Sequence, residues 1–302
     1  MWKVISSSNI DKKRWDKAIT ESFNSSVLAL SWYLDSTNPK WQALVFNDYE
    51  AVFPLSVGKK FGVSYLYQPH FTNYFDVYTS NKSIYTKLLQ EALVKITSDY
   101  KFIDVNIPTV GYLGQVKLTA KHSQMLQLNQ SHSDSVKKYS ENTVRNIKKA
   151  QKNIFALHTA IEAEDFVRLF KKYTHKKISA YNSKEYKMMI EIMKQSTANG
   201  VGKIYVLKKE QEVIAASYYL VWQNRVLYFK GFTTEVGKSI GAMHYIMDKV
   251  IKEYQNKDFV LDFGGSNVDS VARFNKGFGA VDYTYLNFKY NKLPRIISVF
   301  KK

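Results

Sequence analysis

The most constraining feature of the sequence is a single order of elements that occurs twice along the chain. In the first half, two apolar runs at residues 41–46 and 51–57 flank a turn signal at residues 47–50, which predicts a β-hairpin. In the second half, the apolar runs 203–207 and 213–222 flank a polar segment in the same way. A chain of 302 residues that repeats one order of elements is expected to contain two related domains.

Each hairpin is followed by the same further elements. A strand is predicted at 63–68 and at 225–231, then an apolar-faced helix, then a short buried strand at 102–107 and at 259–263. A last alternating strand closes each half. The apolar positions of the two helices are Ile84, Leu88, Leu89, Leu93 and Ile96, and Ile240, Met243, Ile246, Met247, Val250, Ile251 and Tyr254. This order predicts an α/β (α+β) protein in which each half has a mixed, mostly antiparallel sheet flanked by helices.

Several classes of site and protein are excluded or disfavoured by composition. Cysteine is absent, which excludes disulfides, thiolate zinc sites, iron–sulfur clusters and a cysteine nucleophile. His158 and His175 show no metal-like spacing with other ligands, so we expect no metal. The first eight residues do not form a signal peptide, and the apolar stretch near residues 213–223 is too short to span a membrane. We therefore expect a cytoplasmic protein without a transmembrane segment.

Positive charge is concentrated in the second half of this basic protein. The formal net charge is +18, and Phe, Trp and Tyr make up 15% of the residues. Residues 1–130 contain 14 Lys/Arg and 10 Asp/Glu, whereas residues 131–302 contain 30 and 16, giving net charges of +4 and +14. An excess of positive charge indicates an anionic partner, such as a phosphorylated cofactor, a nucleic acid or a membrane surface.

A glycine-containing segment precedes the long helix of the second half. Amide groups at a helix N-terminus bind phosphate, and glycines let the backbone approach a ligand closely. The equivalent first-half segment, residues 78–83, has no glycine. The alternative is an ordinary turn with a chance lysine. The residues predicted to bind a cofactor are Gly237, Lys238, Ser239, Ile240, Gly241 and Ala242.

A second candidate is a basic helix face within residues 140–152. Arg145, Lys148, Lys149 and Lys152 recur at helical spacing, so they share one face. Such a face suits a phosphate chain or RNA, although a solvated amphipathic helix would show the same pattern.

A third candidate is the end of the strand at 259–263 and the segment that follows it. Gly264 and Gly265 would open a mouth in which a ligand approaches the backbone, or they would serve only as turns. Arg273 and Lys276 are expected on the next short helix. On the last strand, Tyr283, Tyr285 and Asn287 share a face that would line a cleft, and Tyr285 is the candidate that would donate a proton to a leaving group. His244, at the edge of an apolar helix face, is more typical of a structural histidine than of a general base.

These segments together resemble a known family. The pattern Ser140-x-x-x-x-Arg145-Asn146-Ile147-x-Lys149-Ala150, with Asp262-Phe263-Gly264-Gly265 and Arg273-Phe274-x-x-Gly277-Phe278-Gly279, resembles the Fem-type and BioF2-like branch of the GNAT acyltransferase superfamily. The resemblance covers most of the chain. It implies two tandem GNAT-like domains: residues 1–132, a degenerate domain without a phosphate loop, and residues 133–302, with the acyl-donor site.

The resemblance also implies roles for particular residues. The segment 237–242 would hold the pyrophosphate of an acyl-CoA, with acetyl-CoA as the default donor. The Phe-Lys pair of the Fem-type motif reads Phe274-Asn275 here, with Lys276 next to it. The candidate catalytic residues are Asn275, Lys276 and Tyr285. The candidate substrate-binding residues are Arg145, Lys149, Gly264, Gly265, Arg273 and Phe274.

Three functions remain open at this point. The first is an N-acyltransferase that transfers an acyl group from an acyl-CoA to an amine by direct attack, since the chain has no thiol for an acyl-enzyme. The second is a Fem-type ligase, which uses aminoacyl-tRNA to extend the stem peptide of a peptidoglycan precursor. The third is a non-catalytic binding module. The acceptor would be a small molecule or a cell-wall precursor that carries an amine, and the sequence leaves the oligomeric state open.

Overall fold

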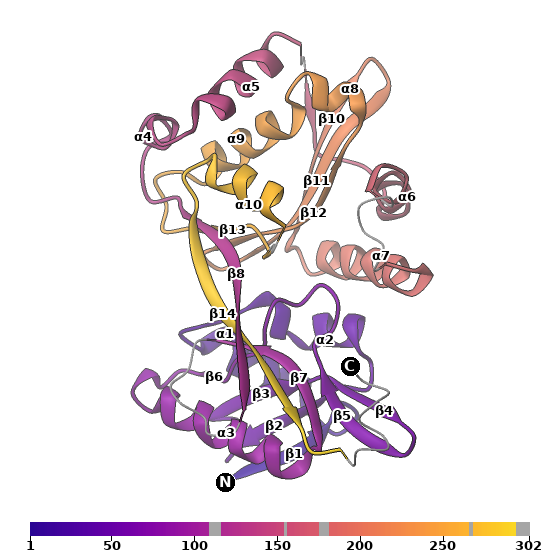
Figure 1. Cartoon of the computed structure of the whole chain (residues 1–302), viewed down its shortest axis with the longest axis vertical. Coiled ribbons are helices and arrows are strands. Elements are labelled where there is room, and N and C mark those ends of the chain that lie inside the picture. The colour runs from indigo at the N-terminus through magenta and orange to yellow at the C-terminus, as the bar shows by residue number, and fades with distance from the viewer. Residues whose placement is uncertain (109–115, 154–155, 175–180, 266–267, 294–302) are drawn as a thin grey trace. The chain divides into compact units, whose positions relative to one another are not determined.

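The computed structural model divides the chain into two compact units (Figure 1). It describes residues 1–108, 116–153, 156–174, 181–265 and 268–293. The first unit comprises residues 1–121 and 284–302, and the second comprises residues 122–283. The boundary expected from the sequence, between residues 132 and 133, falls inside the second unit at the start of a helix. Among the described residues, no helix is long and apolar enough to cross a membrane.

The first unit combines antiparallel strand pairs with helices. One sheet has the strand order β1-β2-β3-β6, and the strands β4, β5, β7 and β14 pair in a second set in which only β5 and β7 run parallel. The predicted hairpin is β2 and β3, with Leu44 opposite Phe53. The elements are β1 (Trp2–Ser6), α1 (Lys12–Glu21), α2 (Ser31–Thr37), β2 (Gln42–Phe46), β3 (Ala51–Leu55), β4 (Val57–Lys60), β5 (Val63–Tyr67), β6 (Tyr78–Thr79), α3 (Tyr85–Asp99) and β7 (Phe102–Ile107), with short 3-10 turns at Val27–Ala29 and Lys82–Ile84.

The second unit is built around strands in the order β8-β13-β12-β11-β10-β9. Its strand pairs are antiparallel except for β12 and β13. Two strands, β8 (Lys117–Gln127) and β14 (Val281–Asn291), cross the boundary between the units. The other elements are α4 (His132–Lys137), α5 (Glu141–Gln151), β9 (Leu157–His158), α6 (Ala163–Thr174), α7 (Ser183–Ala198), β10 (Gly202–Lys209), β11 (Glu212–Trp222), β12 (Arg225–Thr233), α8 (Glu235–Ser239), α9 (Ala242–Tyr254), β13 (Val260–Asp262) and α10 (Asp269–Lys276).

Helices cover both faces of this second sheet. Helices α5 and α9 lie on one face, and α6 and α7 lie on the other (Figure 1). Helix α9 buries Ile246, Met247, Val250 and Ile251 in the core, because these residues recur at helical spacing on its inner side. The predicted fold class, mixed and mostly antiparallel sheets flanked by helices, is confirmed.

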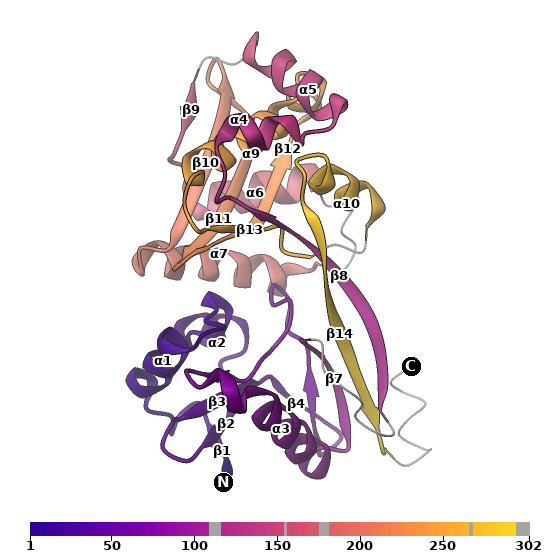
Figure 2. The ribbon, with the colours of Figure 1, turned by 90° about the vertical axis from the view of Figure 1, so that its left-hand side faces the viewer.

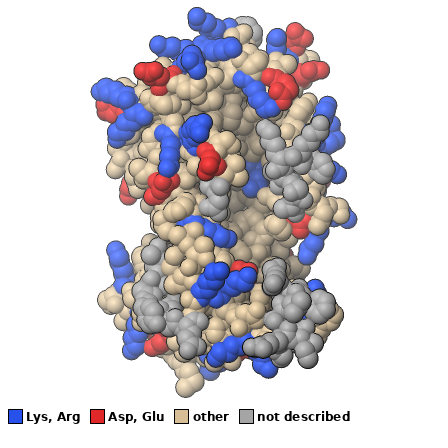
Figure 3. All heavy atoms as spheres, viewed as in Figure 1, with Lys and Arg blue, Asp and Glu red and all other residues tan. Residues whose placement is uncertain are grey.

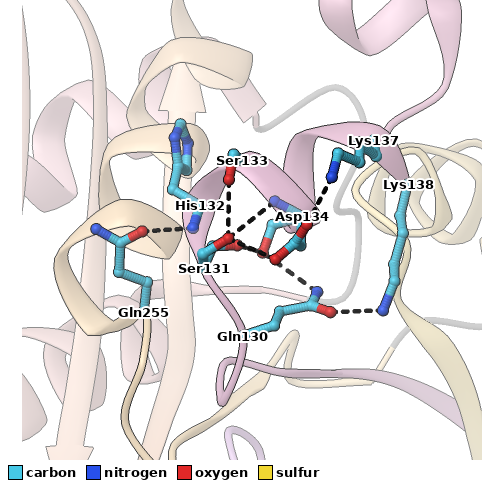
Figure 4. A network of polar contacts seen from close by, with 9 residues as sticks. Gln130, Ser131, His132, Ser133, Asp134, Lys137, Lys138 and Gln255 are labelled. Atoms are coloured by element: carbon cyan, nitrogen blue, oxygen red, sulfur yellow. Dashed lines mark hydrogen bonds and ion pairs between the residues drawn. The ribbon is translucent and has the colours of Figure 1, made fainter.

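Helix α4 begins with a network of polar contacts (Figure 4). Ser131 caps the helix: its side chain accepts a hydrogen bond from the Asp134 backbone amide at 3.2 Å. The backbone amide of His132 donates to Gln255, just after α9 (Figure 4). The His132 ring also contacts the buried Asp248 carboxylate of α9 at 2.7 Å. The hydroxyl of Tyr139 donates to the same carboxylate at 3.2 Å. These bonds attach the segment that leads into α5 firmly to α9.

Candidate functional site

Strands β12 and β13 separate after a short stretch of parallel pairing. The last pair is Leu227 with Asp262. Beyond it the chain turns at Gly264, whose φ is +78°, and a Cβ there would lie 2.7 Å from the Tyr228 carbonyl oxygen. The register between β11 and β12 also shifts, because Tyr218 pairs with Lys230 and Tyr219 with Tyr228, which leaves Phe229 as an extra residue. Beyond Leu227, the backbone groups of β12 that face β13 therefore have no hydrogen-bond partner on that strand.

A cavity of about 440 Å³ opens beside the separated strands. Its walls come from β12, from the first turns of α9, from α10, from the end of α6 and from Phe263 after β13. Every lining residue belongs to the second unit. The described residues that line it are Tyr173, Thr174, Tyr228, Gly231, Phe232, Thr233, Lys238, Gly241, Ala242, Met243, His244, Met247, Phe263, Ser270, Val271, Phe274 and Asn275.

The segment predicted as a phosphate loop forms the short helix α8 and a glycine turn. Its backbone amides are partly used inside the protein: Gly237 donates to the Thr234 hydroxyl, Lys238 to the Thr234 carbonyl, and Gly241 to the Lys238 carbonyl. The first α9 amide bonded within the helix is that of Tyr245, which donates to Gly241. The amides of residues 242–244 come before this bond, as in the first turn of any α-helix. The backbone donors best placed for an anion at the cavity are therefore those of residues 242–244.

His244 forms one wall of the cavity together with an aromatic cluster. Its ring lies 4.9 Å from the Phe274 ring and 6.0 Å from the Phe278 ring, measured between centroids. Burial lowers the pKa of His244 to about 4, because the apolar surroundings disfavour the charged imidazolium. The imidazole is therefore neutral at pH 7 and contributes a polar but uncharged group to the wall.

Asn275 and Lys276 have different surroundings although they are adjacent. Asn275 is 3% exposed, and its amide donates to the Gln124 side chain at 3.0 Å. Gln124 in turn donates to Asp282 at 3.1 Å. The Lys276 ammonium pairs with the same Asp282 at 2.6 Å and does not line the cavity. Asp282 has a lowered pKa, mainly because of its hydrogen bond with Lys276. The amide of Asn275 is thus engaged in holding α10 to β8.

Asp262 fixes the turn after β13. It is 2% exposed and accepts hydrogen bonds from the Gly264 amide at 2.9 Å and from the Ser123 hydroxyl at 3.3 Å. The Arg225 guanidinium lies 3.4 Å from the same carboxylate. The ion pair with Arg225 and these hydrogen bonds hold the segment of which Phe263 lines the cavity.

The structure separates the remaining predicted site residues. Tyr285 belongs to the first unit, where its ring lies 5.8 Å from that of Tyr74. Arg145 and Lys149 are exposed on α5 and line a different groove, of about 750 Å³, between α4 and α5. Gly265 follows Gly264 at a φ of +75°, and Arg273 is exposed on α10. The cavity therefore brings together Lys238, Gly241, Ala242, Phe274 and Asn275, but neither Lys276, Tyr285 nor the basic helix face.

The α4–α5 groove is basic. Figure 3 shows Lys and Arg side chains gathered over these helices. The cations that line the groove are Lys137, Arg145, Lys148, Lys149 and Lys152, against one carboxylate, Glu141. Lys137 pairs with Asp134 at 2.8 Å, and Arg145 donates to the Asn142 side chain.

Most residues of the cavity wall were not predicted as site residues from the sequence, and three of them show why. Tyr228 is next to the extra residue of β12, Thr174 ends α6, and Met247 lies a turn inside α9. In the sequence, Met247 and Tyr228 belong only to a helical and a strand pattern, and their place in the cavity wall depends on the separation of β12 and β13, which leaves no local signal. Among the described residues, no group of three or more His, Asp or Glu is placed to hold a metal ion.

Comparison with known proteins agrees with this geometry. Residues 137–274 match the sequence profile described as the acetyltransferase (GNAT) domain. This range includes α9, most of α10 and every described residue that lines the cavity except Asn275. The predicted family resemblance is confirmed: the matched region is a GNAT domain, the type of domain found in acyltransferases. No curated protein matches the sequence.

Solved structures extend the likeness to the whole chain. FemX superposes with a TM-score of 0.65 at 11% identity and covers 99% of this chain and 100% of its own. A protein of unknown function from Bacteroides thetaiotaomicron gives 0.65 at 10% identity, covering 96% and 99%. L-PGS from Bacillus licheniformis gives 0.56 at 10% identity, covering 96% and 95%. At these identities the likeness shows a shared fold, which is Fem-like over its full length.

Proposed function

We propose that this protein is an N-acyltransferase that takes an acyl group from an acyl-CoA and transfers it to an amine by direct attack. The observation that carries the proposal is the cavity beside the separated strands β12 and β13, which lies at the start of α9 within the region that matches the GNAT domain. In this proposal, acetyl-CoA is the default donor, and the acceptor is a small molecule or a cell-wall precursor that carries an amine.

The residues around the cavity would divide the work of binding. The amides of residues 242–244 and the Lys238 ammonium at the rim would face the cofactor's phosphates, because both attract anions. The CoA thioester supplies the activated acyl group. The backbone groups released where β12 leaves β13 would hold the acyl arm in place by hydrogen bonds.

His244 would support the attack of the amine from the cavity wall. Because its pKa is lowered to about 4, the neutral ring does not repel an incoming amine and offers a hydrogen-bond partner to it. The chain has no cysteine and therefore cannot form a thioester intermediate with the acyl group. Direct transfer to the amine needs no such intermediate. Asn275, whose amide is bonded to Gln124, would act as a positioning residue for α10.

The test is a calorimetric titration with CoA and acetyl-CoA. We expect binding to the wild type and about tenfold weaker binding to Lys238→Ala, the loss of roughly one charge-assisted contact. Lys252→Ala removes a comparably exposed lysine near the end of α9 and should bind as the wild type does. The acyl-CoA proposal is refuted if the wild type does not bind the ligand at a concentration of about 1 mM. A Kd of about 1 mM corresponds to a binding free energy of only about 4 kcal/mol.

The α4–α5 groove favours a second candidate, in which the donor is an aminoacyl-tRNA and the protein a Fem-type ligase. The groove carries five cations, and the whole chain has the FemX fold. Under this proposal, wild-type binding of tRNA would weaken steeply as salt is raised. Replacing Arg145, Lys148, Lys149 and Lys152 by alanine would abolish most of that binding.

A matched control separates a specific groove from general basic charge. A variant in which Lys3, Lys13, Lys17 and Lys87 of the first unit become alanine loses the same charge from exposed positions. We expect it to retain tRNA affinity within about twofold, well under 1 kcal/mol. Equal loss in both variants would mean that tRNA binds by net charge alone, against the ligase proposal.

A further inference from the structure

The cavity wall consists mainly of apolar side chains. Phe232, Met243, Met247, Phe263 and Phe274 line the space, and the rings of His244 and Phe274 pack edge to face. Such a wall favours a ligand group that removes apolar surface from water when it binds.

No carboxylate lines the cavity among the residues that the structure describes. All Asp and Glu residues of the chain are described, because positions 109–115, 154–155, 175–180, 266–267 and 294–302 contain neither. Glu235, on α8, pairs with Lys238 at the rim, and its side chain is 86% exposed. Among the described residues that line the cavity, the groups that could carry a charge near pH 7 are Lys238, which is cationic, and His244, which burial keeps neutral.

A cationic group would thus enter this cavity without a counterion. Moving an ammonium out of water is unfavourable unless a carboxylate or several acceptors receive it, and the described side chains that line the cavity offer no carboxylate. An alkyl chain meets no such opposition and gains from contact with the phenylalanines and methionines.

From this wall chemistry we infer that the protein selects acyl groups that are apolar and carry no positive charge. The inference rests on the proposed acyltransferase function and adds the class of acyl group. Lysyl-like groups, with an ammonium at the end of the chain, are rejected, and aliphatic groups of similar length are accepted.

An isosteric pair of donors tests this selection. Heptanoyl-CoA and 6-aminohexanoyl-CoA differ only in a terminal methyl against a terminal ammonium. We expect calorimetry to give at least a tenfold lower Kd for heptanoyl-CoA. Equal binding, or tighter binding of 6-aminohexanoyl-CoA, overturns the inference while leaving the proposed function intact.

A substitution in the wall provides a second measurement. Val271 lines the cavity, is 42% exposed and lies in the first turn of α10, where an aspartate suits the helix. Val271→Asp should reduce the ratio of the Kd of 6-aminohexanoyl-CoA to that of heptanoyl-CoA at least fivefold. The neutral control Val271→Asn should leave this ratio unchanged. A preference unchanged in Val271→Asp contradicts the inference.

The carrier is tested separately from the acyl group. If CoA itself does not bind, the same two acyl groups are joined to the 3′ end of an RNA minihelix and titrated again, with the same expected preference. Failure of both carriers to bind refutes the proposed function and the inference with it. A carrier that binds with no preference for the heptanoyl group refutes the inference alone.

Discussion

Asn275 occupies the position where the family pattern has a lysine, yet its surroundings are those of a structural residue. Its buried amide donates to Gln124, which donates to Asp282. Asn275→Ala leaves the Gln124 oxygen without its donor, and a buried unsatisfied acceptor costs about 1–3 kcal/mol. We therefore expect the free energy of unfolding, measured in urea, to fall by that amount.

The neighbouring lysine gives the control for this measurement. Lys276 is half exposed, and its pair with Asp282 is of the kind that contributes under about 1 kcal/mol. Lys276→Ala should change the free energy of unfolding much less than Asn275→Ala does. A larger effect for Lys276→Ala would show that the ion pair, not the buried amide, fastens α10.

His244 makes stability depend on pH in a predictable direction. Its folded pKa of about 4 lies below the value of 6.5 in the unfolded chain, so the unfolded state binds the proton more readily between these values. The contribution of neutral His244 is present above pH 6.5 and is lost as the pH falls towards 4. Wild type should lose more stability between pH 7 and pH 5 than His244→Phe does in chemical denaturation. Parallel curves for the two proteins would contradict the lowered pKa.

Among the elements, the sequence pattern predicted those helices and strands whose formation depends on neighbouring residues. The hairpin β10–β11 and the helix α9 follow from apolar periodicity, which is written into neighbouring residues. The sequence predicts a glycine-containing phosphate-binding segment before the long helix but no separate helix α8, because α8 depends on the Thr234 cap and on the close approach of Gly237 to the distant Ile214 carbonyl. Only part of the cavity could be predicted from the sequence, for the same reason. Its glycines have a local sequence signature, whereas the separation of β12 from β13 has none.

The contact between α5 and α9 depends on Gly241. Its φ is +77°, and a Cβ would lie 2.5 Å from the Asn146 carbonyl oxygen of α5. Gly241→Ala therefore combines the cost of a left-handed alanine, of order 1–2 kcal/mol, with a clash against backbone. We expect a clearly larger fall in Tm than for Gly200→Ala, where φ is +69° and nothing lies within 4 Å. Equal Tm values for the two variants would mean that α5 moves away freely.

At the scale of the whole molecule, chain order and structural unit do not coincide. Residues 284–291 of β14 pair with β7 in the first unit, as in the pair Phe288 with Val105. The last described strand of the chain thus completes a sheet begun nearly two hundred residues earlier. The repeated order of elements in the sequence does not predict this arrangement, because it assigns each half its own last strand.

Phe288 provides the test of this discontinuous unit. The side chain is 1% exposed, and Phe288→Ala should cost about 3–5 kcal/mol as the first unit loses a core ring. Hydrogen exchange measured by mass spectrometry would then show faster exchange in β7 and in β2–β3, which lie far before Phe288 in the chain, with α9 and β11 unchanged. Faster exchange confined to residues 133–283 would instead support a contiguous division of the chain near residue 132, with β14 belonging to the second half.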